Sequence, residues 1–236
     1  ALGFAYADIW NTPVAGAAEI SLDRGSGQIK VHRFWTAVNP GIVVNPDVVV
    51  AQCESNVIFG LGQAFSLALA KAGADVFVPS VMDDDGSTRR LVEAAGRRYE
   101  YLKADITAQG TAARVIDGCV ERLGGIDILV NSAGICPMAE VLDFGRPQWD
   151  ATVAVNLTAA FELSYEAAQK MIPQKSGKII NICSLFSFLG GRWSSAYAAT
   201  KHGLAGFTKA YCDELAMHNI QVNGIAPGFF RTETDA

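Results

Sequence analysis

The chain has 236 residues, about half of them apolar, and a formal net charge of −5. This length is enough for one sizeable core or two small ones, and an acidic balance without a basic run argues against a nucleic-acid partner. No stretch approaches the roughly 18 apolar residues of a membrane span, and no basic, apolar leader opens the chain. We therefore expect a globular, cytoplasmic protein that binds neither nucleic acid nor a membrane.

The chain changes character near residue 60. Before it, residues 14–22 and 29–38 are rich in strand formers and flank a turn cluster at 23–27. After it, apolar spacing predicts helices that alternate with short strands. The expected helices cover 61–72, 91–95, 112–123, 149–172 and 197–218, and the expected strands cover 74–79, 99–103, 126–130, 178–183 and 220–225. This alternation predicts right-handed βαβ units in one parallel sheet with helices on both faces.

Cysteine and histidine give no sign of a metal site or of disulfides. The five cysteines show no CxxC spacing, and the three histidines are scattered. This pattern favours buried thiols in a reducing compartment and predicts no metal centre.

One group of residues predicts proton-transfer chemistry. Tyr197 and Lys201 stand four residues apart, and Ser184 lies 13 residues before Tyr197. Residues four apart share one face of a helix, where the lysine charge would lower the tyrosine pKa from about 10 toward the range useful for proton transfer. A serine hydroxyl nearby can orient a carbonyl or alcohol oxygen. The alternative is an ordinary pair on a helix surface.

Several further motifs follow one another in the order of a known family. Gly60-Leu61-Gly62 opens the first expected helix, Asn131-Ser132-Ala133-Gly134 follows a strand, and Asn156 lies within the long helix. Together with Ser184, Tyr197 and Lys201, and with Pro227-Gly228 and Thr232, they make residues 60–236 resemble the short-chain dehydrogenase/reductase family. The resemblance implies an α/β fold, a Rossmann-like doubly wound parallel sheet. The segment Ile180–Gly191 and its flanks are most similar to dehydrogenases of gluconate-type sugar acids.

The resemblance implies reversible hydride transfer between a nicotinamide cofactor and a secondary alcohol. Tyr197 would take the hydroxyl proton, Lys201 would lower the pKa of Tyr197 and hold the nicotinamide ribose, Ser184 would bind the substrate oxygen, and Asn156 would position a water. The implied cofactor-binding residues are Asn56, Gly60, Gly62, Ser80, Asp105, Asn131, Ala133, Gly134, Tyr197, Lys201, Pro227, Gly228 and Thr232.

Four of the site residues also have a plainer interpretation. Asp105 fits the N-cap of a helix over 108–123, Asn131 and Gly134 fit turn chemistry after a strand, and Asn156 fits a surface amide of a helix. Ser80 stands where a strand-end acid would bind an adenosine ribose. With neither acid nor arginine there, NAD and NADP both stay open, and the lack of an adjoining basic residue favours NAD.

The first part of the chain resembles a different family. Trp10-Asn11-Thr12-Pro13, Val31-His32-Arg33 and Asn45-Pro46-Asp47 are similar to the large molybdopterin-binding subunit of aldehyde and isoquinoline oxidoreductases. No segment resembles the GxGE of that family's catalytic glutamate, so we do not expect molybdopterin chemistry here. The domain prediction is a β-rich segment of foreign character at 1–47 and an incomplete dinucleotide-binding domain at 48–236.

The two resemblances overlap at Gly60–Ala64, and the join alters the phosphate loop. Where the family has G-x-x-x-G-x-G, this chain has Asn56-Val57-Ile58-Phe59-Gly60-Leu61-Gly62. Bulky side chains there restrict the approach of backbone amides to phosphates. A substitute first strand is available at 48–51, and after Thr232 the family continues with a substrate-covering helix and one more strand.

Two other interpretations of the whole chain stay open. It is either a non-catalytic chimeric or truncated product that folds without a cofactor, or a fragment of a molybdenum hydroxylase. For the dehydrogenase we expect a small-molecule substrate and a homo-oligomer formed through the long helices.

Overall fold

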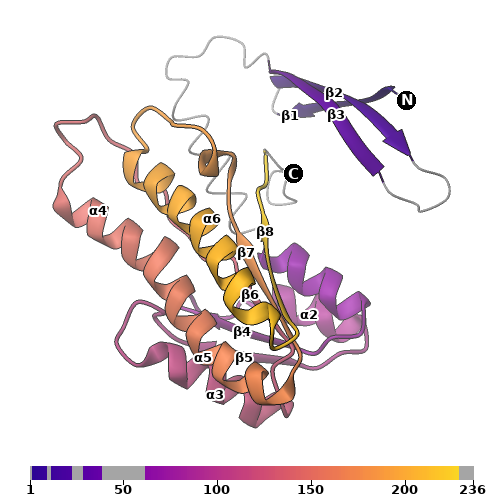
Figure 1. The fold of residues 1–236 in the computed structure, drawn as a ribbon, viewed down its shortest axis with the longest axis vertical. Coiled ribbons are helices and arrows are strands. Elements are labelled where there is room, and N and C mark those ends of the chain that lie inside the picture. The colour runs from indigo at the N-terminus through magenta and orange to yellow at the C-terminus, as the bar shows by residue number, and fades with distance from the viewer. Residues whose placement is uncertain (1, 10–11, 23–28, 39–61, 229–236) are drawn as a thin grey trace. The chain divides into compact units, whose positions relative to one another are not determined.

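The computed structural model describes residues 2–9, 12–22, 29–38 and 62–228, and side chains from residue 62 onward. The chain divides into two compact units, Ala1–Val48 and Val49–Ala236. The first unit contains an antiparallel sheet in the order β1-β2-β3, with a register shift between Glu19 and Ile20. Its strands are β1 (Leu2–Ile9), β2 (Thr12–Leu22) and β3 (Ile29–Val38) (Figure 1).

The second unit alternates helices with parallel strands, which confirms the predicted α/β fold. A helix over 62–71 comes first. Then follow β4 (Val76–Ser80), α2 (Ser87–Ala94), β5 (Tyr99–Lys103), α3 (Thr111–Leu123), β6 (Ile128–Asn131), α4 (Arg146–Val153), α5 (Ala159–Gln174), β7 (Gly177–Ile182), α6 (Ser195–Ala216) and β8 (Ile220–Ile225). Most expected boundaries differ from these by a few residues.

Among the described residues the five strands form two separate parallel sheets, so these residues confirm the parallel pairing but not the single continuous sheet. Strands β4 and β5 pair with each other, and β6, β7 and β8 form a second sheet. The strand order of a doubly wound fold explains the gap between the two groups, because in that order the strand before the first helix is central in the sheet. The segment predicted to be that strand, 48–51, lies outside the described residues.

Helices cover both faces of these strands (Figure 1). On one face, α3, α5 and α6 pack over a core that includes Ile179 of β7 and Met171 of α5. On the other face, Phe65 of the first helix packs against Ile180 and Ile182. Alternate residues of β7 therefore face opposite layers, as the two-residue period of a strand requires. The carboxyl ends of β6, β7 and β8 lie at one edge, where open α/β sheets bind ligands.

The long helix predicted over 149–172 is interrupted. Between α4 and α5 the backbone forms one π-helical segment, η1 (Ala154–Thr158), with Asn156 at its centre. A π segment inside an α-helix is rare and occurs often at functional sites.

Among the described residues, no helix is both long and apolar enough to cross a bilayer.

Candidate active site

Tyr197 and Lys201 lie on the first turns of α6 and are almost completely buried. Their exposed fractions are 4% and 2%, so the alternative of an ordinary surface pair is wrong. The Lys201 Nζ lies 5.4 Å from the centroid of the Tyr197 ring. Helix α6 begins after Ser194, whose carbonyl accepts from the Ala198 amide at 2.9 Å.

The ammonium of Lys201 is fixed at the end of β7. Its Nζ donates to the carbonyl of Ile182, the last residue of that strand, at 2.6 Å. The hydroxyl of Ser187 donates to the Lys201 carbonyl at 2.8 Å. Because a hydrogen bond from a charged donor is stronger than one between neutral groups, the lysine is held in one position relative to the sheet.

Ser184 lies two residues after the last residue of β7 and caps a 3-10 turn, η2 (Leu185–Ser187). Its Oγ accepts from the Phe186 amide at 3.2 Å, and its own amide donates to the Ser187 Oγ at 3.2 Å. The ring of Phe186 packs edge-on against Tyr197, with centroids 5.9 Å apart. Phe186 therefore connects the Ser184 turn to Tyr197.

Asn156 is buried, with 1% of its surface exposed, so its interpretation as a surface amide is wrong. Its Oδ1 accepts from the amide of Ile135 at 2.8 Å, and its Nδ2 donates to the carbonyl of Ile135 at 2.9 Å. The same Nδ2 donates to Thr200 Oγ1 at 3.2 Å, and Thr200 donates to the Tyr197 carbonyl at 2.8 Å. The π segment thus ties the loop after β6 to the helix that carries Tyr197.

Asn131 ends β6, and its side chain lies inside the core toward α5. Its Nδ2 donates to Asn181 Oδ1 at 2.8 Å and to Ser164 Oγ at 3.0 Å. The amide of Asn181 in turn donates to Thr208 of α6 at 2.9 Å. A contact between Asn131 and a cofactor would therefore involve its backbone. A Cβ atom added at Gly62 would lie 3.8 Å from Ser132 Oγ, so the first helix begins beside this loop.

The predicted adenosine contacts occupy the ends of two neighbouring strands. Ser80 ends β4, and its Oγ accepts from the Met82 amide at 3.1 Å. Asp105 follows β5, and its Oδ1 accepts from the amide and the hydroxyl of Thr107 at 2.9 and 2.7 Å. These bonds, from the hydroxyl first and then the amide, lower the pKa of Asp105. Asp105 is not the N-cap of α3, because Gly110 holds that position and Asp105 forms a separate turn.

The remaining predicted cofactor residues divide into two groups. Ala133 and Gly134 follow β6, and Pro227 and Gly228 follow β8, at the carboxyl ends of those strands. Asn56, Gly60 and Thr232 lie outside the described residues, as do Val57, Ile58 and Phe59.

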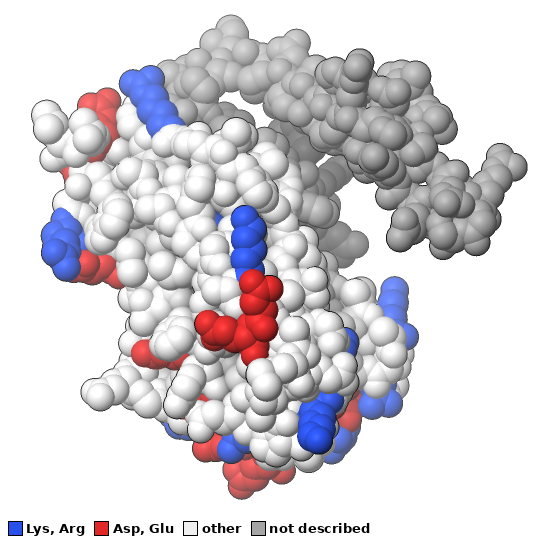
Figure 2. Space-filling model, viewed as in Figure 1, with Lys and Arg blue, Asp and Glu red and all other residues white. Residues whose placement is uncertain are grey.

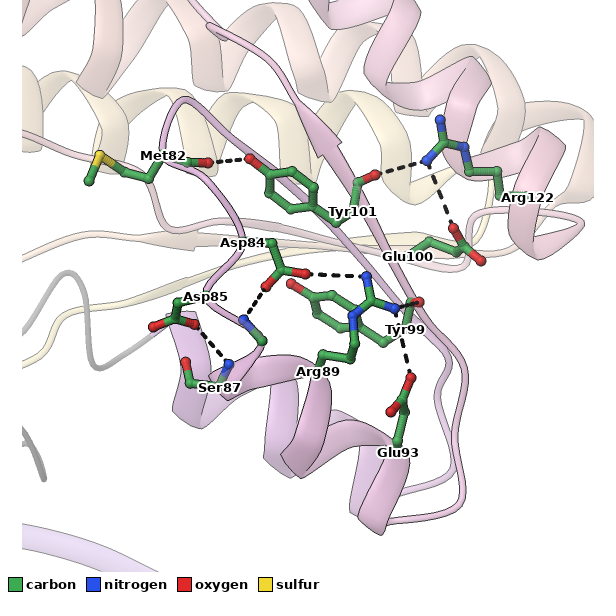
Figure 3. A network of polar contacts seen from close by, with 11 residues as sticks. Met82, Asp84, Asp85, Ser87, Arg89, Glu93, Tyr99, Glu100, Tyr101 and Arg122 are labelled. Carbon is green, nitrogen blue, oxygen red and sulfur yellow. Dashed lines mark hydrogen bonds and ion pairs between the residues drawn. The ribbon is translucent and has the colours of Figure 1, made fainter.

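Two basic side chains next to the loop that follows β4 are paired with carboxylates, and Figure 3 shows the pairs that Arg89 makes. Arg89 contacts Asp84 at 3.2 Å and Glu93 at 3.7 Å. Lys103 contacts Asp83 at 2.6 Å. The hydroxyl of Tyr101 donates to the Met82 carbonyl and so fixes the loop that follows β4.

A family model for short chain dehydrogenases matches residues 57–236, which is most of the chain. The chain belongs to the short-chain dehydrogenase family. A second model, a molybdopterin cofactor-binding domain, matches residues 8–71, so the two matches share residues 57–71.

Relatives of this short-chain dehydrogenase include oxidoreductases from Escherichia coli K12. The chain is 64% identical over 174 residues to the uncharacterized oxidoreductase YgcW, covering 74% of this chain and 67% of that protein. It is 40% identical to 2-dehydro-3-deoxy-D-gluconate 5-dehydrogenase, covering 78% and 71%. The crystal structure of acetoin dehydrogenase from Enterobacter cloacae superposes with a TM-score of 0.70 at 39% identity, covering 74% of this chain and 73% of that one.

Membership of the family implies a nicotinamide dinucleotide cofactor. The described residues fit both the adenosine end and the nicotinamide end of such a dinucleotide. Ser80 and Asp105 are hydrogen-bond acceptors at the ends of neighbouring strands, which suits the hydroxyl and amino donors of an adenosine. At the other end, Lys201 is a donor beside Tyr197.

Sequence reasoning missed three residues that position the site: Thr200, Ser187 and Phe186. Thr200 binds Asn156 and the Tyr197 carbonyl, and Ser187 binds the Lys201 carbonyl. The signal for Ser187 was its place three residues after Ser184, the spacing of a reciprocal cap. Among the residues that the structure describes, no group of three or more His, Cys, Asp or Glu side chains could hold a metal ion.

Proposed function

We propose that the chain transfers a hydride between a nicotinamide cofactor and a secondary alcohol of a gluconate-type sugar acid. The main support is the burial of Tyr197 beside Lys201 at the carboxyl end of β7, next to the Ser184 turn. The sugar-acid class is supported by relatives that are about 40% identical and carry gluconate in their names.

Tyr197 is the proton acceptor in alcohol oxidation and the donor in the reverse direction. The charge of Lys201, 5.4 Å from the ring centroid, favours the phenolate form of Tyr197 because opposite charges attract strongly in a buried setting. A buried phenol is also held in one rotamer, so its oxygen meets the substrate in one orientation.

Ser184 orients the substrate oxygen, and Asn156 keeps the loop after β6 in place. The hydroxyl of Ser184 already accepts one bond from Phe186, which leaves its own proton for the substrate oxygen. Asn156 holds both polar groups of the Ile135 backbone, so it acts in this account by positioning.

Ser80, Asp105, Tyr197 and Lys201 would hold the cofactor, whose nicotinamide ring accepts or returns the hydride when bound. We propose NAD in preference to NADP. A 2′-phosphate is usually accommodated by an arginine near the end of the second strand. Here Arg89 is engaged by Asp84 and Lys103 by Asp83, so neither cation is available without breaking an ion pair.

A second candidate function is supported by the overlap of the two family matches. Residues 57–71 belong to both, and Val57, Ile58 and Phe59 stand where small residues should approach the phosphates. In this case the chain folds but binds no cofactor.

Titration with NAD and NADP, followed by the intrinsic fluorescence of Trp149 and Trp193, separates these two candidates. The dehydrogenase predicts a saturable change with NAD and a weaker response to NADP. The absence of a change with both nucleotides would favour the non-catalytic alternative. Equal affinities for both would contradict the assignment of NAD.

A further inference from the structure

A hollow of about 690 Å³ lies beside the candidate active site. Its walls are the segment after β6, the start of α4 and the segment before α6. Ser195, the first residue of α6, lines it, whereas Asn156, Ser184, Tyr197 and Lys201 do not. A volume of this size is typical of small-molecule sites. Ser195 and Tyr197 belong to the same first turn of α6, so the hollow adjoins the turn that carries Tyr197, although residues two apart point to different sides of a helix.

The lining of the hollow includes two arginines and two tryptophans. They are Arg146, Trp149, Arg192 and Trp193, and one carboxylate, Glu140, opposes the two positive charges. Arg146 is engaged, because its Nε lies 2.6 Å from Asp150. Within residues 62–228, no carboxylate forms an ion pair with Arg192. Arg192 is therefore the cation of the hollow that is left for a ligand.

The guanidinium of Arg192 is held in place by its neighbour. It lies 4.7 Å from the centroid of the Trp193 ring, within the range of a cation–π contact. Trp193 has a φ of 64°, in the left-handed region that a bulky residue rarely adopts. Its carbonyl accepts from the amide of Ala139 across the hollow at 3.4 Å. Strain of this kind persists where surrounding contacts enforce it, and it concentrates at ligand sites.

The same segment is packed against the catalytic tyrosine. A Cβ atom added at Gly191 would lie 2.6 Å from Cζ of Phe186 and 2.5 Å from Oγ of Ser194. Phe186 contacts Tyr197 edge-on. Arg192 therefore directly follows Gly191, which lies so close to Phe186 that a larger residue would not fit there.

We propose that Arg192 binds the carboxylate of the substrate while the tryptophan rings flank its carbon chain. This inference rests on the proposed function. The gluconate relatives are named 5-dehydrogenases. For oxidation at C5 of a gluconate-type acid, the carboxylate lies four carbons from the reacting carbon, so a cation near Tyr197 but outside its immediate surroundings would suit it. Lys201 is buried and bound to Ile182, and Arg146 is bound to Asp150, which leaves Arg192. A planar guanidinium suits a carboxylate because it donates two parallel hydrogen bonds.

The test compares Arg192→Gln with Arg114→Gln, a change at an exposed arginine of α3 that does not line the hollow, in the full chain. Gluconate and its uncharged counterpart sorbitol are titrated, and both KM and kcat are measured with gluconate and NAD. Arg192→Gln should raise the Kd and KM for gluconate by roughly 10- to 150-fold, the loss of one charge-assisted contact, with kcat little changed. Its affinity for sorbitol should not change. Arg114→Gln should keep the values of the unaltered chain, and thermal unfolding of both variants checks the fold.

The outcomes separate this inference from the proposed function. If hydride transfer takes place but the KM for gluconate does not depend on Arg192, the carboxylate site is wrong and the proposed function stands. Gluconate binding that depends on Arg192 without any hydride transfer would overturn the proposed function and leave the carboxylate site. A chain that binds gluconate no better than sorbitol, or that loses as much affinity from Arg114→Gln, would contradict the assignment to Arg192.

Discussion

Burial distinguishes Tyr197 and Lys201 from a common helical pair. On a helix surface, water would screen the lysine charge and leave the tyrosine close to its ordinary chemistry. Here both side chains are enclosed between α6 and the end of β7, and the ammonium has a fixed acceptor in the Ile182 carbonyl. The interaction is therefore stronger and better oriented than the four-residue spacing alone implies.

Tyr99 gives a prediction about pH. Burial, and then the negative charge of Asp84, raise the pKa of Tyr99 to about 12. In the unfolded chain a tyrosine loses its proton near pH 10. Between these values the unfolded state binds fewer protons than the folded state, so the free energy of unfolding falls as the pH rises.

Tyr99→Phe should remove this part of the alkaline destabilisation. Urea unfolding of the unaltered chain and of the variant, measured at about pH 9 and about pH 11, is the appropriate experiment. The Tyr99 variant should lose less stability over this interval than the unaltered chain. Identical losses in both proteins would show that Tyr99 titrates alike in the folded and unfolded states.

Among the elements, we expect the join before the first helix to limit how well a cofactor binds. Replacing residues 56–59 with Gly-Ser-Ser-Thr should strengthen NAD binding. Small residues let backbone amides reach the phosphates, and each charge-assisted bond regained contributes roughly 1.5–3 kcal/mol. One or two such bonds correspond to about one to four orders of magnitude in affinity. Calorimetric titration with NAD giving no tighter binding by the altered chain would show that the join is not the limiting feature.

Motif order and apolar spacing were sufficient to predict the alternating elements and the place of Tyr197, Lys201 and Ser184 at a strand end. They were not sufficient for the π segment, because inserting one residue into a helical turn leaves the apolar period almost unchanged. The burial of Asn156 and the inward side chain of Asn131 depend on partners 21 and 50 residues away, Ile135 and Asn181. The strain at Trp193 likewise depends on a distant contact with Ala139.

At the scale of the whole molecule, we propose that two copies associate through the long helices. Figure 2 shows uncharged areas over α4, α5 and α6, with a group of basic and acidic side chains near the middle of this face. Phe161 and Tyr165 of α5 are 47% and 51% exposed, and Phe161 packs edge-on against Phe207 of α6. Exposed aromatic side chains of this kind are typical of interfaces.

Phe161→Glu should therefore convert a dimer or larger oligomer into a monomer. Analytical ultracentrifugation at several concentrations gives the oligomeric state. The control is Leu142→Glu, which adds the same charge at a residue that is 95% exposed in the segment before α4. A monomeric unaltered chain, or equal association of both variants, would count against this interface.

We propose that Tyr197 performs proton transfer in a nicotinamide-dependent oxidation. The most direct test is the rate at which the full chain forms reduced nicotinamide from NAD and a gluconate-type sugar acid, compared with its Tyr197→Phe variant. We expect measurable turnover by the unaltered chain and a loss of roughly 10²- to 10⁴-fold in the variant, with the same thermal unfolding, because one hydroxyl is removed at little change in volume. Near-normal turnover by Tyr197→Phe, or none by the unaltered chain at saturating NAD, would contradict it.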